Sequence, residues 1–213
     1  MNVIAADIVL LPDPETARKA IEANQYLVQW YDSDLLLHRT QCLPHISLSM
    51  GCIDTTQLDT IEKHLWDIVS QSSLQTLACA GIGISRHAHG QMVSSLEITR
   101  DPTLQRLHET VMQHMAPFYH SDVTEDMIFG DELVSDSTLE WIRQYTTHSA
   151  FHLFEPHITL GYGPLPDRSL PKTIGIQGLA LCHLGNHCSC RKALIEIPWN
   201  QPNLGTDPIK SRP

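Results

Sequence analysis

Apolar and polar residues follow two different periods along this chain. Runs with strand character occupy residues 3–11, 44–52, 74–85, 92–99, 157–162, 173–184 and 190–197. Apolar residues that recur three and four positions apart predict helices over residues 13–26, 54–69, 101–115 and 135–145. Strands and helices therefore alternate along the sequence, which indicates a mixed fold.

Each predicted helix begins at a residue that can accept hydrogen bonds from the first free backbone N–H groups. Asp13 and Asp101 each precede a proline, and Asp54 and Ser135 stand at the other two helix starts. A capping residue followed by proline is a strong start signal, because proline at the first helical position needs no hydrogen-bond partner for its nitrogen.

Three stretches lack either period. We expect a connecting loop at residues 31–43. The acidic, Ser- and Thr-rich composition of residues 117–137 predicts a mobile surface loop. Residues 198–213 are rich in proline and predict a flexible tail. No low-complexity linker divides the 213 residues, so residues 1–213 are expected to form a single two-lobed domain.

The charge balance narrows the possible partners. Fourteen Lys and Arg against 24 Asp and Glu give a net charge of −10, which disfavours an extensive nucleic-acid surface. A small anion, or a nucleic-acid end held by a few groups, is compatible with this charge. No run approaches a membrane span, and residues 1–11 lack the basic start of a secretory leader. We therefore expect a cytoplasmic monomer without membrane attachment.

The six cysteines form no C-x-x-C motif, and we expect reduced thiols. Five residues with soft donor atoms cluster near the end of the chain: Cys182, His183, His187, Cys188 and Cys190. Such donors suit Zn²⁺, but this spacing fits no common structural zinc site. Alternation along a strand would also direct adjacent residues of the cluster to opposite faces.

Two segments about half the chain apart share the pattern P-H-I-[S/T]-L-x-x-G. They are residues 44–51 and 156–163. The shorter pattern H-x-[S/T] also occurs at His38, His108 and His187, but these three lack the flanking proline and apolar residues. The repeated longer pattern is therefore the specific signal.

Side chains two residues apart share one face of a strand. His45 and Ser47 should thus point together, as should His157 and Thr159. The apolar residues between and after them should point into the core. Each motif then offers a titratable nitrogen and a hydroxyl on a rigid support.

In these motifs the sequence resembles the two-histidine phosphoesterase superfamily, which includes bacterial RNA 2′,3′-cyclic phosphodiesterases, also called 2′-5′ RNA ligases. That superfamily carries two H-x-[S/T] motifs flanked by apolar residues, one per lobe, as in His45-Ile46-Ser47 and His157-Ile158-Thr159. A second likeness is the strand at 93–98 that leads into Leu104-Gln105-Arg106-Leu107-His108.

The resemblance implies an α+β fold with two pseudo-symmetric lobes. Two antiparallel sheets, one per lobe, would form a concave cleft that carries both motifs, with helices packed outside. It also implies an enzyme that hydrolyses a 2′,3′-cyclic phosphate or a 2′-5′ linkage at a nucleotide or RNA end.

In that chemistry His45 and His157 would act as general acid and general base, with the assignment between them open. Ser47 and Thr159 would donate hydrogen bonds to the phosphate oxygens. The scheme requires no metal or other cofactor. Tyr162 stands where the bacterial ligase-like group tends to have arginine, and it is a candidate substrate-binding residue that could stack on a base or bond the phosphate.

Two other functions stay open. The same fold could bind a nucleotide or RNA end without turnover. Alternatively, the cluster at 182–190, or His87 and His89 in a predicted loop, could hold a catalytic metal. The chain has neither the G-x-S-x-G elbow of serine hydrolases nor a P-loop.

Overall fold

The computed structural model describes residues 2–31, 33–72, 74–86, 90–120, 122–166 and 171–199. Within these ranges the strands are β1 (Val3–Pro12), β2 (Ile46–Asp54), β3 (Thr76–Arg86), β4 (Met92–Ile98), β5 (His157–Tyr162), β6 (Thr173–Leu184) and β7 (Cys190–Pro198). The α-helices are α1 (Pro14–Tyr31), α2 (Leu58–Gln71), α3 (Pro102–Met115) and α4 (Asp136–His148). The expected α+β class is confirmed.

The described strands form one antiparallel sheet in the order β2–β1–β6–β3–β4–β5, and β7 also pairs with β6. β6 joins the two halves, because its residues 176–183 pair with β1 while residues 173–175 pair with β3. The expectation of two separate sheets is therefore wrong. A strand of 12 residues is long enough to pair with a different neighbour at each end.

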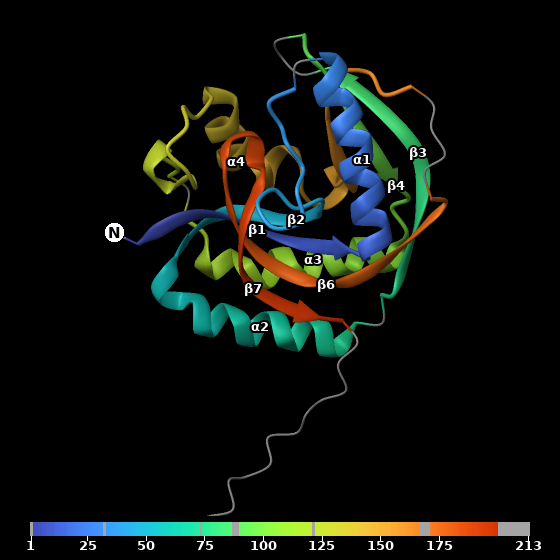
Figure 1. Ribbon diagram of the computed structural model, residues 1–213. Coiled ribbons are helices and arrows are strands. Elements are labelled where there is room, and N and C mark those ends of the chain that lie inside the picture. Colours follow the sequence, from blue (N-terminus) through green and yellow to red (C-terminus); the bar gives the residue numbers. More distant parts are fainter. Residues whose placement is uncertain are drawn as a thin grey trace, which may run out of the picture.

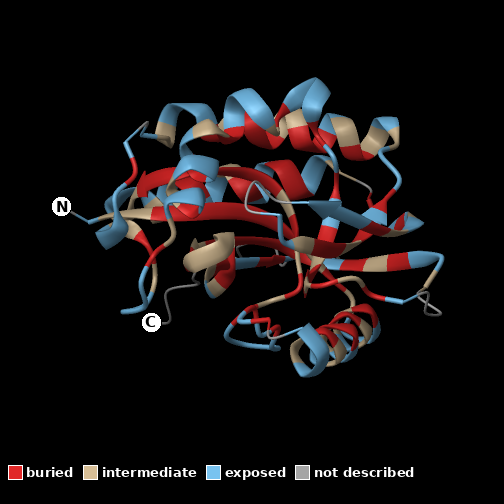
Figure 2. Cartoon of the chain, turned by 90° about the horizontal axis from the view of Figure 1, so that it is seen from above, coloured by how far each residue is buried: buried red, intermediate tan, exposed pale blue. Residues whose placement is uncertain are grey.

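Helices cover the sheet and bury their inner faces, while their outer faces are exposed (Figure 2). α2 and α3 pack against each other below the β2–β1–β6 part of the sheet (Figure 1), and α3 contacts β2. α1 packs along β5, and α4 packs against β2. None of the helices in the described ranges has the length and apolar character needed to cross a membrane.

The predicted helix starts are largely correct. The side chains of Asp13, Asp101 and Ser135 accept hydrogen bonds from backbone N–H groups in the first turns of α1, α3 and α4. Asp54 caps a single 3₁₀ turn that precedes α2, and not α2 itself. α1 runs to Tyr31, five residues beyond the predicted end, because Leu27 continues its buried stripe.

Among the described residues, the stretch 117–137, expected as a mobile surface loop, contains short 3₁₀ turns and an isolated bridge from His120 to Cys52 before α4. Its side chains Val123, Ile128 and Val134 are buried in an apolar cluster, so the expectation of a surface loop is wrong for them.

Residues 200–213 of the expected tail lie outside the described residues, as do His87 and His89. What positions the candidate site is thus the sheet, with β2 near one end of the strand order and β5 at the other.

Candidate active site

The first motif starts with His45, directly before β2, and continues along β2, whereas the second motif lies on β5; β2 and β5 contact each other. The apolar residues of both motifs are fully buried in the main core, as predicted: Ile46, Leu48, Ile158 and Leu160. Ser47 and Thr159 are only half-buried. The predicted alternation is therefore confirmed, with core residues on one face and the hydroxyls on the other.

Both motif histidines are held by the same local hydrogen bond. His45 Nδ1 donates to the carbonyl oxygen of Leu43 at 2.7 Å, and His157 Nδ1 donates to that of Glu155 at 2.8 Å. Because a carbonyl oxygen only accepts, Nδ1 carries a hydrogen in both rings. In each ring Nε2 is therefore the nitrogen that can take up or release a proton.

The two motif strands share a further irregularity. Leu48 has no partner in the register of β2 with β1, and Leu160 has none in the register of β5 with β4. In both strands the unpaired residue follows the motif hydroxyl directly. Such a bulge bends the strand and redirects the side chains around it. The two motifs are thus alike in backbone geometry as well as in sequence.

The two rings differ in burial. The His45 side chain keeps 15% of its surface exposed, whereas His157 is an exposed residue. Burial lowers the pKa of His45, the hydrogen bond with Leu43 raises it, and the positive charge of His157 lowers it. The geometric link between the two motifs is the contact between β2 and β5.

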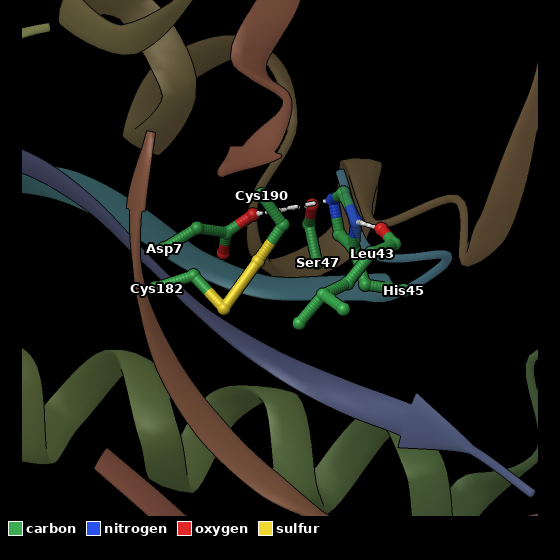
Figure 3. Close-up of a disulfide and its surroundings, with 6 residues drawn as sticks. All are labelled: Asp7, Leu43, His45, Ser47, Cys182 and Cys190. Atoms are coloured by element: carbon green, nitrogen blue, oxygen red, sulfur yellow. Dashed lines mark hydrogen bonds and ion pairs between the residues drawn. A yellow bond between two sulfur atoms is a disulfide. The ribbon is translucent and has the colours of Figure 1, made fainter. Parts of the chain in front are cut away.

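A buried carboxyl that the sequence did not reveal lies beside the first motif. Asp7 Oδ2, on β1, shares a hydrogen bond of 2.6 Å with Ser47 Oγ and lies 3.9 Å from His45 Nε2 (Figure 3). Asp7 has no exposed surface, and this burial raises its pKa to about 8, although the hydrogen bond with Ser47 lowers it. The available signal was a lone carboxylate within an otherwise apolar strand.

Tyr162 lies farther along β5, and the Leu160 bulge places it on the same face as Thr159. Its hydroxyl oxygen is 2.8 Å from Nδ1 of His187, in the 3₁₀ turn Asn186–Cys188. Nε2 of His187 lies 3.2 Å from Asp34 Oδ2. Burial raises the pKa of Tyr162 to about 12. A histidine from the loop between β6 and β7 therefore fixes the candidate substrate-binding tyrosine.

The remaining H-x-[S/T] histidines lie in other surroundings. His38 is exposed and pairs with Thr40 through Nδ1 at 3.0 Å. His108 is fully buried inside α3 and stacks on Phe154, with ring centroids 4.0 Å apart. Neither histidine has the strand geometry of the two motifs.

Cys182 of β6 and Cys190 of β7 form a disulfide, with their Cα atoms 5.6 Å apart (Figure 3). The expectation of reduced thiols is therefore wrong for this pair, because the antiparallel pairing of β6 with β7 brings them together. The four other cysteines are free: Cys42, Cys52, Cys79 and Cys188.

The disulfide also changes the interpretation of the cysteine and histidine cluster. Two of its sulfur atoms are bonded to each other and are not available as thiolates. Among the described residues, no three His, Cys, Asp or Glu side chains gather where they could hold a metal ion.

Neither a protein-family model nor a curated protein matches the chain. The structural neighbours include E. coli LigT. Its crystal structure in complex with phosphate has a TM-score of 0.46 and 12% identity, covering 93% of this chain and 98% of LigT. Its apo form has a TM-score of 0.48 at the same identity and coverage. A crystal structure of a phosphoesterase has a TM-score of 0.47 and 11% identity, covering 93% and 99%.

Proposed function

We propose that this chain is a phosphodiesterase that hydrolyses a 2′,3′-cyclic phosphate, or a 2′-5′ linkage, at a nucleotide or RNA end. The observation that carries the proposal is the matched pair of histidines, His45 and His157. Each has Nδ1 bound to a carbonyl two residues upstream, and each stands two residues before a hydroxyl that lies on a strand. Two such rings, each with Nε2 left for proton transfer, are what acid–base cleavage of a phosphodiester needs.

The electrostatics favour His45 as the base and His157 as the acid. Two nearby imidazolium charges repel, so charging both rings at once is disfavoured. The buried ring of His45 is the poorer place for that charge, because burial disfavours the charged form. His45 is therefore the better candidate for the neutral base, and His157 takes the role of the acid in the scheme.

In the proposed reaction, His45 Nε2 takes a proton from a water molecule as the water oxygen attacks phosphorus. The bond from phosphorus to one ribose oxygen breaks, and His157 Nε2 gives its proton to that departing oxygen. Ser47 and Thr159 donate hydrogen bonds to the non-bridging phosphate oxygens, where negative charge must be held. These four side chains complete the reaction, and the scheme needs no metal.

The direct test is hydrolysis of a panel of 2′,3′-cyclic and 2′-5′-linked nucleotides with EDTA present. His45→Ala and His157→Ala should each lower kcat by about 10²-fold or more while thermal unfolding stays cooperative. His38→Ala is the matched control, because it removes an exposed H-x-T histidine from the same chain. It should leave turnover unchanged.

Three outcomes would contradict the proposal. Wild-type turnover in either motif variant would reject the acid–base pair. Binding of the same nucleotides without turnover by the wild-type chain would favour the binding module. Activity that EDTA abolishes and zinc restores would favour a metal-dependent reaction.

A further inference from the structure

Asp7 is a titratable residue that the acid–base scheme leaves without a role. In the register of the sheet, its neighbours are Met50 on β2 and Cys182 on β6. Cys182 is bonded to Cys190, so the side of Asp7 toward β6 faces a disulfide (Figure 3). A carboxyl between a thioether and a disulfide is poorly placed to carry a negative charge, and the groups that favour its ionised form are the hydroxyl of Ser47 and the backbone N–H of Ser49.

The other titratable groups around Asp7 do not supply a permanent positive charge. Tyr119 follows α3, Tyr145 lies on α4, and Cys188 lies in the turn between β6 and β7. Burial raises the pKa of all three, and a negative charge on Asp7 raises it further. His45 is the histidine that faces Asp7, and burial disfavours its charged form.

The protonation of Asp7 decides what the Ser47 hydroxyl can do. Ser47 has a single hydroxyl hydrogen, and its oxygen lies 2.6 Å from Asp7 Oδ2. Beside a carboxylate, which only accepts, that hydrogen must point at Asp7. Beside a neutral carboxylic acid, Asp7 donates to Ser47 Oγ, and the Ser47 hydrogen is free to turn toward a phosphoryl oxygen.

We propose that Asp7 is a positioning residue whose neutral carboxylic acid donates a hydrogen bond to Ser47 and so directs the Ser47 hydroxyl to the phosphate. This inference rests on the function proposed for His45 and His157. Burial raises the pKa of Asp7 to about 8, so the neutral form predominates near neutral pH. Ionisation of Asp7 would turn the Ser47 hydroxyl hydrogen toward the carboxylate and away from the phosphate. It would also favour a proton on His45, whose Nε2 is 3.9 Å from Asp7 Oδ2.

The proposal predicts different activities for two substitutions of Asp7. Asp7→Asn supplies an amide N–H donor that cannot ionise, whereas Asp7→Ala supplies no donor. We expect D7N to keep kcat/KM for a 2′,3′-cyclic nucleotide within about fivefold of wild type near neutral pH. D7A should lose about tenfold or more, and adding Ser47→Ala to D7A should cost little further.

The pH profile gives a readout that a merely structural role would not change. Wild-type kcat/KM should show a loss above about pH 8 as Asp7 ionises, whereas D7N, which has no carboxyl to ionise at this position, should lack that loss. A loss in D7N as large as that in D7A would overturn the proposal. So would an alkaline loss in D7N equal to that of the wild type.

An infrared measurement tests Asp7 without relying on turnover. The difference spectrum of wild type minus D7N near neutral pH should contain the carbonyl stretch of a protonated carboxylic acid, which fades as the pH rises through about 8. Asp54→Asn is the control, because backbone and side-chain hydrogen bonds from Thr56 lower the pKa of Asp54, and its spectrum should lack this band.

The infrared band distinguishes a failure of the Asp7 proposal from a failure of the proposed phosphodiesterase function. Absence of the band at neutral pH would overturn the proposal for Asp7, whatever the chain hydrolyses. The band together with an inactive wild-type chain would support the neutral Asp7 and reject the proposed function.

Discussion

The backbone N–H of Phe151 donates a hydrogen bond of 2.7 Å to Nε2 of His108. Nδ1 of the same ring donates to the carbonyl oxygen of Leu48, also at 2.7 Å. His108 thus connects β2, which carries the first motif, with the segment that leads into β5, which carries the second. One nitrogen donates and the other accepts, so the buried ring is neutral.

The stability of the fold should therefore depend on pH through His108. Burial lowers the pKa of His108 in the folded chain, whereas the unfolded ring takes up a proton below about pH 6.5. The unfolded state then binds more protons, so this group lowers the stability as the pH falls below about 6.5. The slope is at most about 1.4 kcal/mol per pH unit, until the folded ring also titrates.

Urea unfolding of the wild type and of His108→Gln at several pH values measures this effect. The difference in unfolding free energy between the two chains should be largest above about pH 6.5 and shrink in acid. His38→Gln, at an exposed histidine, should follow the wild type. A difference that stays constant with pH would show that His108 is not the titrating group.

The Thr159 hydroxyl should act on turnover and not on folding. Thr159→Val keeps the shape of a half-buried strand residue and removes only the hydroxyl. We expect kcat to fall by about 10²-fold with little change in the unfolding temperature, because one donor to the developing charge is lost. Thr159→Ser keeps the hydroxyl and should keep most of the activity. Equal losses in both variants would argue against this role.

Tyr162 should contribute mainly through its ring. Its hydroxyl already shares a hydrogen bond with His187, so Tyr162→Phe should change KM for a nucleotide by less than about threefold. Tyr162→Ala removes a surface on which a base could stack, worth about 1–3 kcal/mol, and should raise KM at least several-fold. If phenylalanine raised KM as much as alanine, the hydroxyl and not the ring would be the contact.

The disulfide predicts a specific count of reactive thiols. In denaturant without reductant, four of the six cysteines should react, since Cys182 and Cys190 are bonded to each other. Reduction should lower the stability by about 2–3 kcal/mol, the chain-entropy value for so short a loop. Cys42→Ala should leave the bond in place and lower the count by one. Six reactive thiols in the wild type would contradict the pairing.

Local chemistry explains why much of the fold could be predicted. Asp13 and Asp101 each stand before a proline, and both cap helices as expected. β5 and β6 have the predicted bounds because apolar residues and turn residues define them clearly. The repeated motif singles out His45 and His157 as candidate site residues, because chance does not place proline, apolar and hydroxyl residues together in this way twice, and their catalytic role stays a prediction.

The remaining features depend on contacts between distant strands. The bond between Cys182 and Cys190 depends on the register of β6 with β7, which shifts twice along the pair. The burial of Asp7 depends on β2 and β6 flanking β1, and residue order does not reveal this. The single sheet forms because β6 pairs with β3 as well as with β1. The alternation of apolar and polar residues predicts a strand but does not predict its partners.

The length of β6 has a mechanical consequence for ligand capture. One end of β6 pairs with β1 and the other end pairs with β3. The part of the sheet next to His45 and the part that carries His157 are therefore joined by one continuous strand. Changing the spacing of the two rings requires bending a paired strand, which is harder than shifting a loop. An anionic ester should thus meet imidazoles whose separation is set before it arrives.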